Sequence, residues 1–216
     1  MDNFDVLAAE RQSLADVLDS LSDQDWTTPS CCVNWTVEDV VAHLTVVWNY
    51  SALDYVRRSF RTRGTWFRPS AALVAINQRT VDERKAAGRH ALIADIRAHV
   101  DDRTSPTGFG IEAPLTDLVV HRRDIRLPLG RLDSEVPEHA RAALDTATKR
   151  QFGLFSTRSA LTGLAFAATD LDWSYGSGPD ITGSAHALAH AMWGRPASLD
   201  ELTGPGVDTL RARLQA

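Results

Sequence analysis

The chain has 216 residues, of which 44% are hydrophobic and 24% are charged, and its formal net charge is −5 at pH 7. This length favours one domain with an appendage, or two small units, and the charge argues against the broad basic surface of a nucleic-acid-binding protein. No apolar run approaches the roughly 18 residues of a membrane span, and the N-terminus lacks the basic and apolar regions of a signal peptide. We therefore expect a cytoplasmic protein that binds neither nucleic acid nor membrane.

The N-terminal part of the chain predicts one helix and then a loop. Apolar residues recur at helical spacing over residues 4–21, which predicts a helix that ends near position 22. Residues 22–34 show no period and predict a loop of about a dozen residues. This loop contains Cys31 and Cys32, whose adjacency suits neither a disulfide nor a zinc finger. We interpret them as small, half-buried residues in a reducing compartment.

A second helix begins at Thr36, whose hydroxyl suits the N-cap when Asp39 follows three residues later. We expect this helix to reach about Tyr50 and to continue through Tyr55. His43 lies at the edge of its apolar stripe, where it is either a core-edge imidazole that donates to a backbone carbonyl or a metal ligand. The arginines that follow form a solvated face, or they hold an anionic substrate; they are Arg57, Arg58, Arg61, Arg63 and Arg68.

Helical patterns then cover residues 70–101 with a break at Gly88, and a loop over residues 104–110 follows. The next helix starts near Pro114, because proline is tolerated in the first turn of a helix. It ends before Pro128.

Three polar side chains share one face of this helix. Asp117, His121 and Asp124 fall within about 60° of arc, so the carboxylate of Asp117 and the imidazole of His121 point the same way. If this helix packs beside the second one, His43, Asp117 and His121 would surround one divalent cation, which is the ligand count of a catalytic zinc. Asp124 would then accept a hydrogen bond that orients an imidazole. A polar pair on a solvated helix face would give the same sequence pattern.

The remaining residues predict a small α+β unit. The expected elements are a helix over residues 137–154, two or three short strands in hairpins between residues 161 and 180, and helices over residues 184–193 and 206–214. Because the pattern changes after Gly130, we divide the chain into a helical bundle, residues 1–130, and a C-terminal domain, residues 131–216.

The other histidines offer one competing metal site. His186 and His190 are four residues apart on a predicted helix, a spacing that suits a shared cation, although no carboxylate lies near them on that helix. His90, His99 and His139 have no partner in the sequence, and we expect them at the surface.

Two stretches resemble the mycothiol-dependent maleylpyruvate isomerase-like family. Cys32, Trp35, Thr36 and His43 match its first motif, and the stretch from Asp117 to Gly130 matches its second motif; the latter includes His121, Asp124 and the Pro-Leu-Gly stop. Residues 164–179 and 194–196 resemble its small C-terminal unit. In two places the chain departs from the family pattern: Asp117 stands where the family has glutamate, and Val33-Asn34 replaces Pro-Gly.

The resemblance implies a mainly α fold, with a DinB-like four-helix bundle followed by a small α+β C-terminal unit. It also implies that His43, Asp117 and His121 bind a divalent metal, zinc or else nickel, and that the cofactor is mycothiol or another low-molecular-weight thiol. The expected partners are therefore this thiol and a small molecule, and the expected assembly is a monomer or a homodimer.

For the function, the resemblance implies a thiol-dependent isomerase or S-transferase that acts on a small electrophile with a carboxylate. The sulfur of the thiol would add to a conjugated double bond, and elimination after rotation would give the isomer. Asp124 and Arg126 are the candidate catalytic residues, and Arg126 would hold the substrate carboxylate. Two alternatives remain: a non-catalytic metal-binding, ligand-binding or stress-related protein on the same fold, and hydrolysis by metal-activated water.

Overall fold

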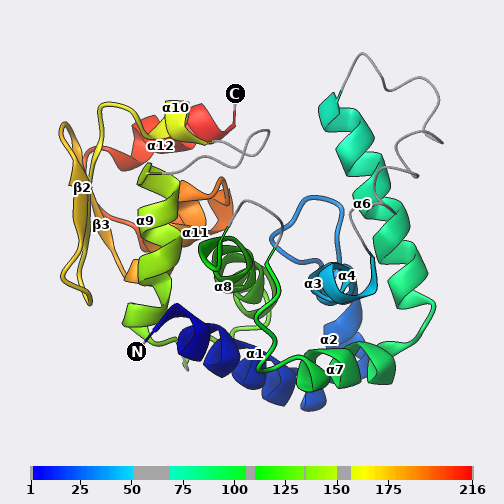
Figure 1. Cartoon of the computed structure of the whole chain (residues 1–216). Helices are drawn as coiled ribbons and strands as arrows, with labels where there is room; N and C mark the ends of the chain where they lie inside the picture. The colour runs from blue at the N-terminus through cyan, green and yellow to red at the C-terminus, as the bar shows by residue number, and fades with distance from the viewer. Residues whose placement is uncertain (1, 51–68, 106–109, 134, 150–156, 216) are drawn as a thin grey trace.

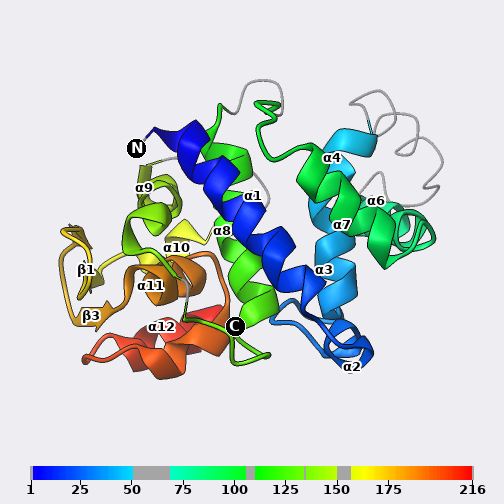
Figure 2. The same cartoon turned by 90° about the horizontal axis from the view of Figure 1, so that it is seen from below.

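The computed structural model describes residues 2–50, 69–105, 110–133, 135–149 and 157–215. The predicted fold class is confirmed, because a helical bundle precedes a small unit of helices and three short strands (Figures 1 and 2). None of the described helices combines the length and the apolar character needed to cross a membrane.

The bundle is built from α1 (Asn3–Asp19), α3 (Val37–Leu44), α4 (Val46–Asn49), α6 (Pro69–Lys85), α7 (Arg89–Ala98) and α8 (Glu112–Arg126). Helix α8 contacts both α1 and α3, and α7 contacts α1, α3 and α6. Figure 2 shows α1 running diagonally across α8, and α3, α6 and α7 lie to the right of this pair. The buried apolar faces of α1, α3 and α8 form one core, so α3 and α8 lie side by side as the metal-site prediction requires.

The start of α3 was predicted correctly, whereas the start of α2 was missed. The hydroxyl of Thr36 accepts a hydrogen bond from the backbone N–H of Asp39, and the backbone N–H of Thr36 donates to the Asp39 carboxylate, as predicted for the start of α3. The predicted loop over residues 22–34 is wrong in part, since α2 (Asp23–Thr27) lies within it and is capped by Ser22 in the same way. The second helix is also interrupted between α3 and α4. Its expected continuation to Tyr55 lies outside the described residues, as does the arginine cluster.

The C-terminal unit contains η1 (Pro137–Ala140), α9 (Arg141–Lys149), α10 (Arg158–Leu161), β1 (Ala165–Ala168), β2 (Ser174–Gly176), β3 (Asp180–Gly183), α11 (Ala185–Met192), η3 (Pro196–Glu201) and α12 (Val207–Leu214). Strands β1 and β2 form the expected antiparallel hairpin, but β3 pairs parallel to β1 on its other side. The link between β2 and β3 therefore crosses the start of β1. Gly178 permits this crossing, because a Cβ there would lie 2.2 Å from the carbonyl oxygen of Gly163.

Helix α11 connects the two parts of the molecule. It packs on α8, on α9 and on the sheet (Figure 1). The buried apolar core continues from the bundle into this unit, and the division at residue 130 stays a prediction. The packing places residues from the end of the chain directly beside the predicted metal-binding face of α8.

Candidate metal centre

The three predicted ligands lie together where α3 packs on α8. The Nε2 atoms of His43 and His121 lie 3.9 and 3.5 Å from Oδ1 of Asp117. The two imidazoles meet edge to face, with their ring centres 4.9 Å apart. One ligand atom from each residue lies within 4.8 Å of the other two. We call His43, Asp117 and His121 the open cluster.

The spacing of the open cluster fits a cation. Ligand bonds of about 2.0–2.2 Å in tetrahedral geometry separate the ligand atoms by about 3.3–3.6 Å. One observed separation falls in this range and the other slightly exceeds it, while both are longer than a normal hydrogen bond. Two imidazole nitrogens and a carboxylate oxygen suit zinc and also nickel. The Asp117 side chain is 50% exposed, so a further ligand can approach from solvent.

The electrostatics of the open cluster also favour a bound cation. Burial lowers the pKa of His121, but the carboxylates of Asp117 and Asp124 outweigh burial and raise this pKa to about 10. Desolvation raises the pKa of Asp117, but the charge of His121 outweighs it and lowers this pKa to about 2. A cation therefore competes with a proton on His121, and its binding would release that proton.

Behind His121 lies a second cluster, centred on Asp124. This aspartate is 0% exposed. Its carboxylate accepts hydrogen bonds from His121 Nδ1 at 2.8 Å, His190 Nε2 at 2.9 Å, Arg195 Nε at 3.0 and 3.1 Å, and Cys32 Sγ at 3.1 Å. We call these five residues the closed cluster.

The closed cluster fixes the orientation of His121. Burial raises the pKa of Asp124, but the hydrogen bonds from His121 and His190 outweigh burial and hold the pKa well below its usual range. Because an ionised carboxylate only accepts hydrogen bonds, Nδ1 of His121 carries a hydrogen and Nε2 faces Asp117. Asp124 thus has the geometry predicted for an acceptor that orients a metal-binding imidazole.

The N-terminal part of the chain is similar to a known protein domain. Residues 7–105 match the family model described as the mycothiol maleylpyruvate isomerase N-terminal domain. These residues are similar to that domain, and they make up slightly less than half of the chain. The matched segment contains His43 and ends before α8, so Asp117 and His121 lie beyond it. No curated protein matches the chain.

Solved structures extend the likeness to both parts of the chain. A crystal structure of the mycothiol-dependent maleylpyruvate isomerase aligns with a TM-score of 0.59 at 14% identity, over 94% of this chain and 91% of that one. A histidine-to-alanine mutant of that isomerase aligns with a TM-score of 0.58 at the same identity and coverage. At this identity the likeness shows a shared fold, which extends over the C-terminal unit.

Among the described residues, two further sets of potential metal ligands contain Asp124, one with Cys32 and His121 and the other with Cys31 and His190. A cation there would meet the Arg195 guanidinium, which lies 3.0 Å from Asp124. Both cysteines are free and half-buried, as predicted. Burial raises the pKa of Cys31 to about 12, so this thiol stays protonated. Of the three sets, the open cluster is therefore the best candidate for a metal.

The structure does not bring Arg126 to the open cluster. Its side chain is buried, and Nε donates a hydrogen bond to the backbone carbonyl of Arg131. The arginine beside the centre is Arg195, whose Nη2 lies 3.6 Å from Cys32 Sγ and whose charge helps to lower the pKa of Asp117. Sequence reasoning missed Arg195, because Asp124 and Cys32, which it contacts beside the centre, are more than 70 residues away. The only signal was its place in the tail motif.

The competing histidine pair divides between different partners. His186 Nε2 donates to the carbonyl of Val136 at 2.9 Å, whereas His190 Nε2 donates to Asp124. In the described part of the chain, no set of potential metal ligands contains His186. Sequence reasoning found His190, but as a ligand of a different site.

The expected surface positions are correct for one of the three remaining histidines. His90 is exposed. His99 is half-buried and stacks on Trp48, with the ring centres 4.6 Å apart. His139 is buried, and its Nδ1 lies 2.6 Å from Oε1 of Glu10. Glu10 lies 129 residues away, so nothing in the local sequence indicates this pair.

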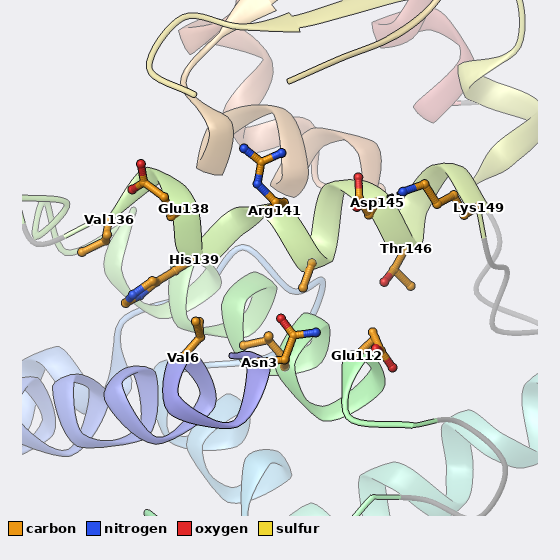
Figure 3. A pocket seen from close by; sticks show the side chains of 12 residues that line it. Asn3, Val6, Glu112, Val136, Glu138, His139, Arg141, Asp145, Thr146 and Lys149 are labelled. Carbon is orange, nitrogen blue, oxygen red and sulfur yellow. Dashed lines mark hydrogen bonds and ion pairs between the residues drawn. The ribbon is translucent and has the colours of Figure 1, made fainter. Parts of the chain in front are cut away.

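A cavity of about 710 Å³ lies elsewhere, between the starts of α1 and α8 and the helix α9 (Figure 3). Its lining includes Val6, His139, Asp145 and Lys149, and none of its lining residues belongs to the open cluster. Lys149 pairs with Asp145 at 2.9 Å, and His139 pairs with Glu10. Three of the ionisable groups on its wall, His139, Asp145 and Lys149, are therefore already paired.

Proposed function

We propose that this chain binds a divalent metal ion through His43, Asp117 and His121, and that it acts as a thiol-dependent isomerase or S-transferase of the mycothiol-dependent type. Zinc is the metal that the donor set favours, and nickel is the alternative. The observation that carries the proposal is the spacing of the three ligand atoms, with His121 fixed from behind by Asp124. The proposed cofactor is mycothiol or another low-molecular-weight thiol, and the substrate is a small electrophile.

Each residue of the open cluster has a defined part in this proposal. His43 and His121 direct Nε2 toward Asp117, and the half-exposed Asp117 leaves the centre accessible to solvent. A divalent cation would stabilise the thiolate of a thiol bound there, and a thiolate adds reversibly to a conjugated double bond, so that its loss after rotation gives isomerisation and its retention gives S-transfer. Asp124 keeps the hydrogen of His121 on Nδ1, so that Nε2 is available to the metal.

Arg195 is the residue that we propose for holding an anionic group of the substrate, in place of Arg126. Asp124 receives its Nε hydrogen bond, and the carbonyl of Trp193 receives one from Nη1 at 3.1 Å. With the contact to Cys32, these partners use three of the five N–H groups of a guanidinium. The others have no partner among the described residues, and a guanidinium matches the geometry of a carboxylate.

The first test is the metal content of the purified protein, measured by mass spectrometry. We expect near-stoichiometric zinc or nickel in the wild type and its loss in His121→Ala. His186→Ala tests the competing histidine pair, and the exposed His90→Ala controls for the removal of an imidazole; both should keep the metal. A metal lost only with His186→Ala, or no metal after reconstitution, would refute the proposed site.

The second test separates an enzyme from a binding protein. The metal-loaded protein should consume an electrophile such as a conjugated dicarboxylate only when a thiol is present, and His121→Ala should abolish this activity. A loaded protein that consumes no electrophile with any thiol would instead be a non-catalytic metal-binding protein. Turnover without a thiol would indicate hydrolysis by metal-activated water.

A further inference from the structure

We infer that His190, on α11, is a positioning residue for the candidate metal centre, and that it acts through Asp124 to hold His121 with Nε2 toward the cation. This inference rests on the proposed metal site. All three proposed ligands lie in the helical bundle, whereas His190 lies in the C-terminal unit, 66 residues after Asp124. The C-terminal unit would thus complete the centre without supplying a ligand.

A continuous chain of hydrogen bonds carries the inference. Arg123 Nε donates to Ser198 Oγ at 3.2 Å, and Ser198 Oγ lies 2.8 Å from Nδ1 of His190. His190 Nε2 lies 2.9 Å from Oδ1 of Asp124, whose Oδ2 lies 2.8 Å from Nδ1 of His121. Ser198 and Asp124 are 0% exposed and His190 is 1% exposed, so solvent does not compete with these bonds.

The hydrogens in this chain can be assigned from the acceptors. Asp124 can only accept, so His190 must carry its hydrogen on Nε2. Burial lowers the pKa of His190, which keeps the ring neutral and leaves Nδ1 as an acceptor. Ser198 then donates its hydroxyl hydrogen to Nδ1 and accepts the hydrogen bond from Arg123. Every donor and acceptor is matched, and the direction of the whole chain is fixed.

The serine, histidine and aspartate resemble a nucleophilic triad, but the burial of Ser198 excludes that role. No face of its hydroxyl is open to a substrate, since the residue is 0% exposed, and its single hydrogen is already donated to His190. The series of hydrogen bonds therefore serves to position Asp124, through its two carboxylate oxygens. His190 bonds Oδ1 and His121 bonds Oδ2, so His190 fixes the oxygen that faces the metal-binding imidazole.

The first test measures zinc affinity by competition with a chromophoric chelator. Because loss of an outer partner of a metal ligand typically weakens metal binding by about 10–100-fold, we expect Asp124→Asn to fall in this range and His190→Leu to lie near its lower end. His190→Gln should restore most of the affinity, since glutamine can donate to Asp124 and accept from Ser198. The control is His186→Leu, which removes a buried histidine from the same helix and should leave the affinity unchanged.

The second test needs no metal. Proton–nitrogen NMR of the metal-free wild type should show a ring N–H of His121 protected from exchange, at Nδ1. This protection should persist in His190→Gln and be lost in His190→Leu. A folded His190→Leu that keeps both the protection and the zinc affinity would overturn the inference. If His190→Leu does not fold, a folded His190→Gln that loses both would overturn it as well.

The two tests also separate this inference from the proposed function. A wild-type protein that shows the protected N–H but binds no zinc would refute the proposed metal site. In that case the effect of His190 on the His121 ring would still be measured by NMR. Zinc binding in the wild type without any dependence on His190 would refute only the positioning role.

Discussion

The two aspartates on one face of α8 lie only seven residues apart, yet their surroundings are opposite. Asp117 is half exposed, and its two histidine neighbours lie beyond hydrogen-bond distance. Asp124 is fully buried and accepts hydrogen bonds from four side chains. Helical periodicity gives both carboxylates the same direction, so the difference in burial comes from their surroundings. Asp117 faces solvent, whereas the C-terminal unit packs against Asp124.

This difference shows how a carboxylate that can bind a metal differs from one that orients a neighbouring side chain. A carboxylate whose hydrogen-bonding capacity is already filled holds its neighbours in place, and a cation would have to displace them. A carboxylate with nearby imidazoles at 3.5 and 3.9 Å still has capacity for a cation. The open and closed clusters share His121, which presents one ring nitrogen to each.

The largest expected effect is on stability, from Asp124→Ala. The substitution leaves Arg195, His190 and Nδ1 of His121 without their acceptor, and breaking a buried ion pair typically costs about 3–5 kcal/mol. Asp117→Ala, on the exposed side, should change the free energy of unfolding by less than about 1 kcal/mol. Urea denaturation with a chelator present measures both values. Equal losses in the two variants would show that the clusters do not differ as described.

Metal binding should reverse this order of sensitivity. Asp117→Ala removes a proposed ligand, so its zinc affinity should fall by more than the roughly 100-fold that marks the upper end for an outer partner. Asp117→Glu should keep the metal, because the half-exposed position has room for one more methylene. Competition with a chelator gives both affinities. A larger loss in Asp124→Asn than in Asp117→Ala would exchange the roles of the two residues.

A third carboxylate, that of Glu10, tests whether hydrogen bonds and ion pairs stabilise the buried charges. Glu10 is 1% exposed, contacts Arg122 and lies 2.6 Å from Nδ1 of His139. Burial raises the pKa of Glu10, but the hydrogen bond from His139 and the charge of Arg122 outweigh burial and lower it. Hydrogen bonds to charged groups contribute about 1.5–3 kcal/mol, so Glu10→Gln should lower stability by about this amount at pH 7.

The sign of the pH dependence follows from the lowered pKa. A carboxyl group with a lower pKa in the folded state stabilises the protein above its unfolded value of about 4.3. That stabilisation is lost as the pH falls through the lower, folded pKa. The difference between wild type and Glu10→Gln should therefore be full at pH 7 and shrink below about pH 4. A difference that is constant with pH would mean that Glu10 acts by packing alone.

The parts of the structure that follow from local spacing could be predicted from the sequence. Thr36 and Asp39 fix the start of α3, and the interval of four residues between Asp117 and His121 places both on one face of α8. The pair Ser22 and Asp25 carried the same capping signal, which the lack of apolar period over residues 22–34 obscured.

The rest of the closed cluster could not be predicted from the sequence, because Cys32, His190 and Arg195 reach Asp124 only through tertiary packing. His190 and Arg195 lie 66 and 71 residues after Asp124, and no periodicity connects them. The sequence suggested Arg126, on the same helix as Asp124, but its Nε donates to the carbonyl of Arg131 instead. Spacing along α8 thus placed two of the proposed ligands, Asp117 and His121, on one face, while His190 and Arg195 come from the unit that packs above.

The smallest expected effect tests the loop that joins the two clusters. Asn34 is exposed and has a φ of +64°, a conformation that costs most residues about 1–2 kcal/mol and that asparagine and glycine tolerate. Asn34→Ala should therefore lower stability by about 1 kcal/mol, and Asn34→Gly should stay close to wild type; denaturation midpoints measure both. Cys32 in this loop donates to Asp124, but no residue of the loop is a proposed ligand, so zinc affinity should not change in either variant. If Asn34→Ala weakened zinc binding as well, the loop would belong to the metal centre, and the open cluster would depend on three elements instead of two.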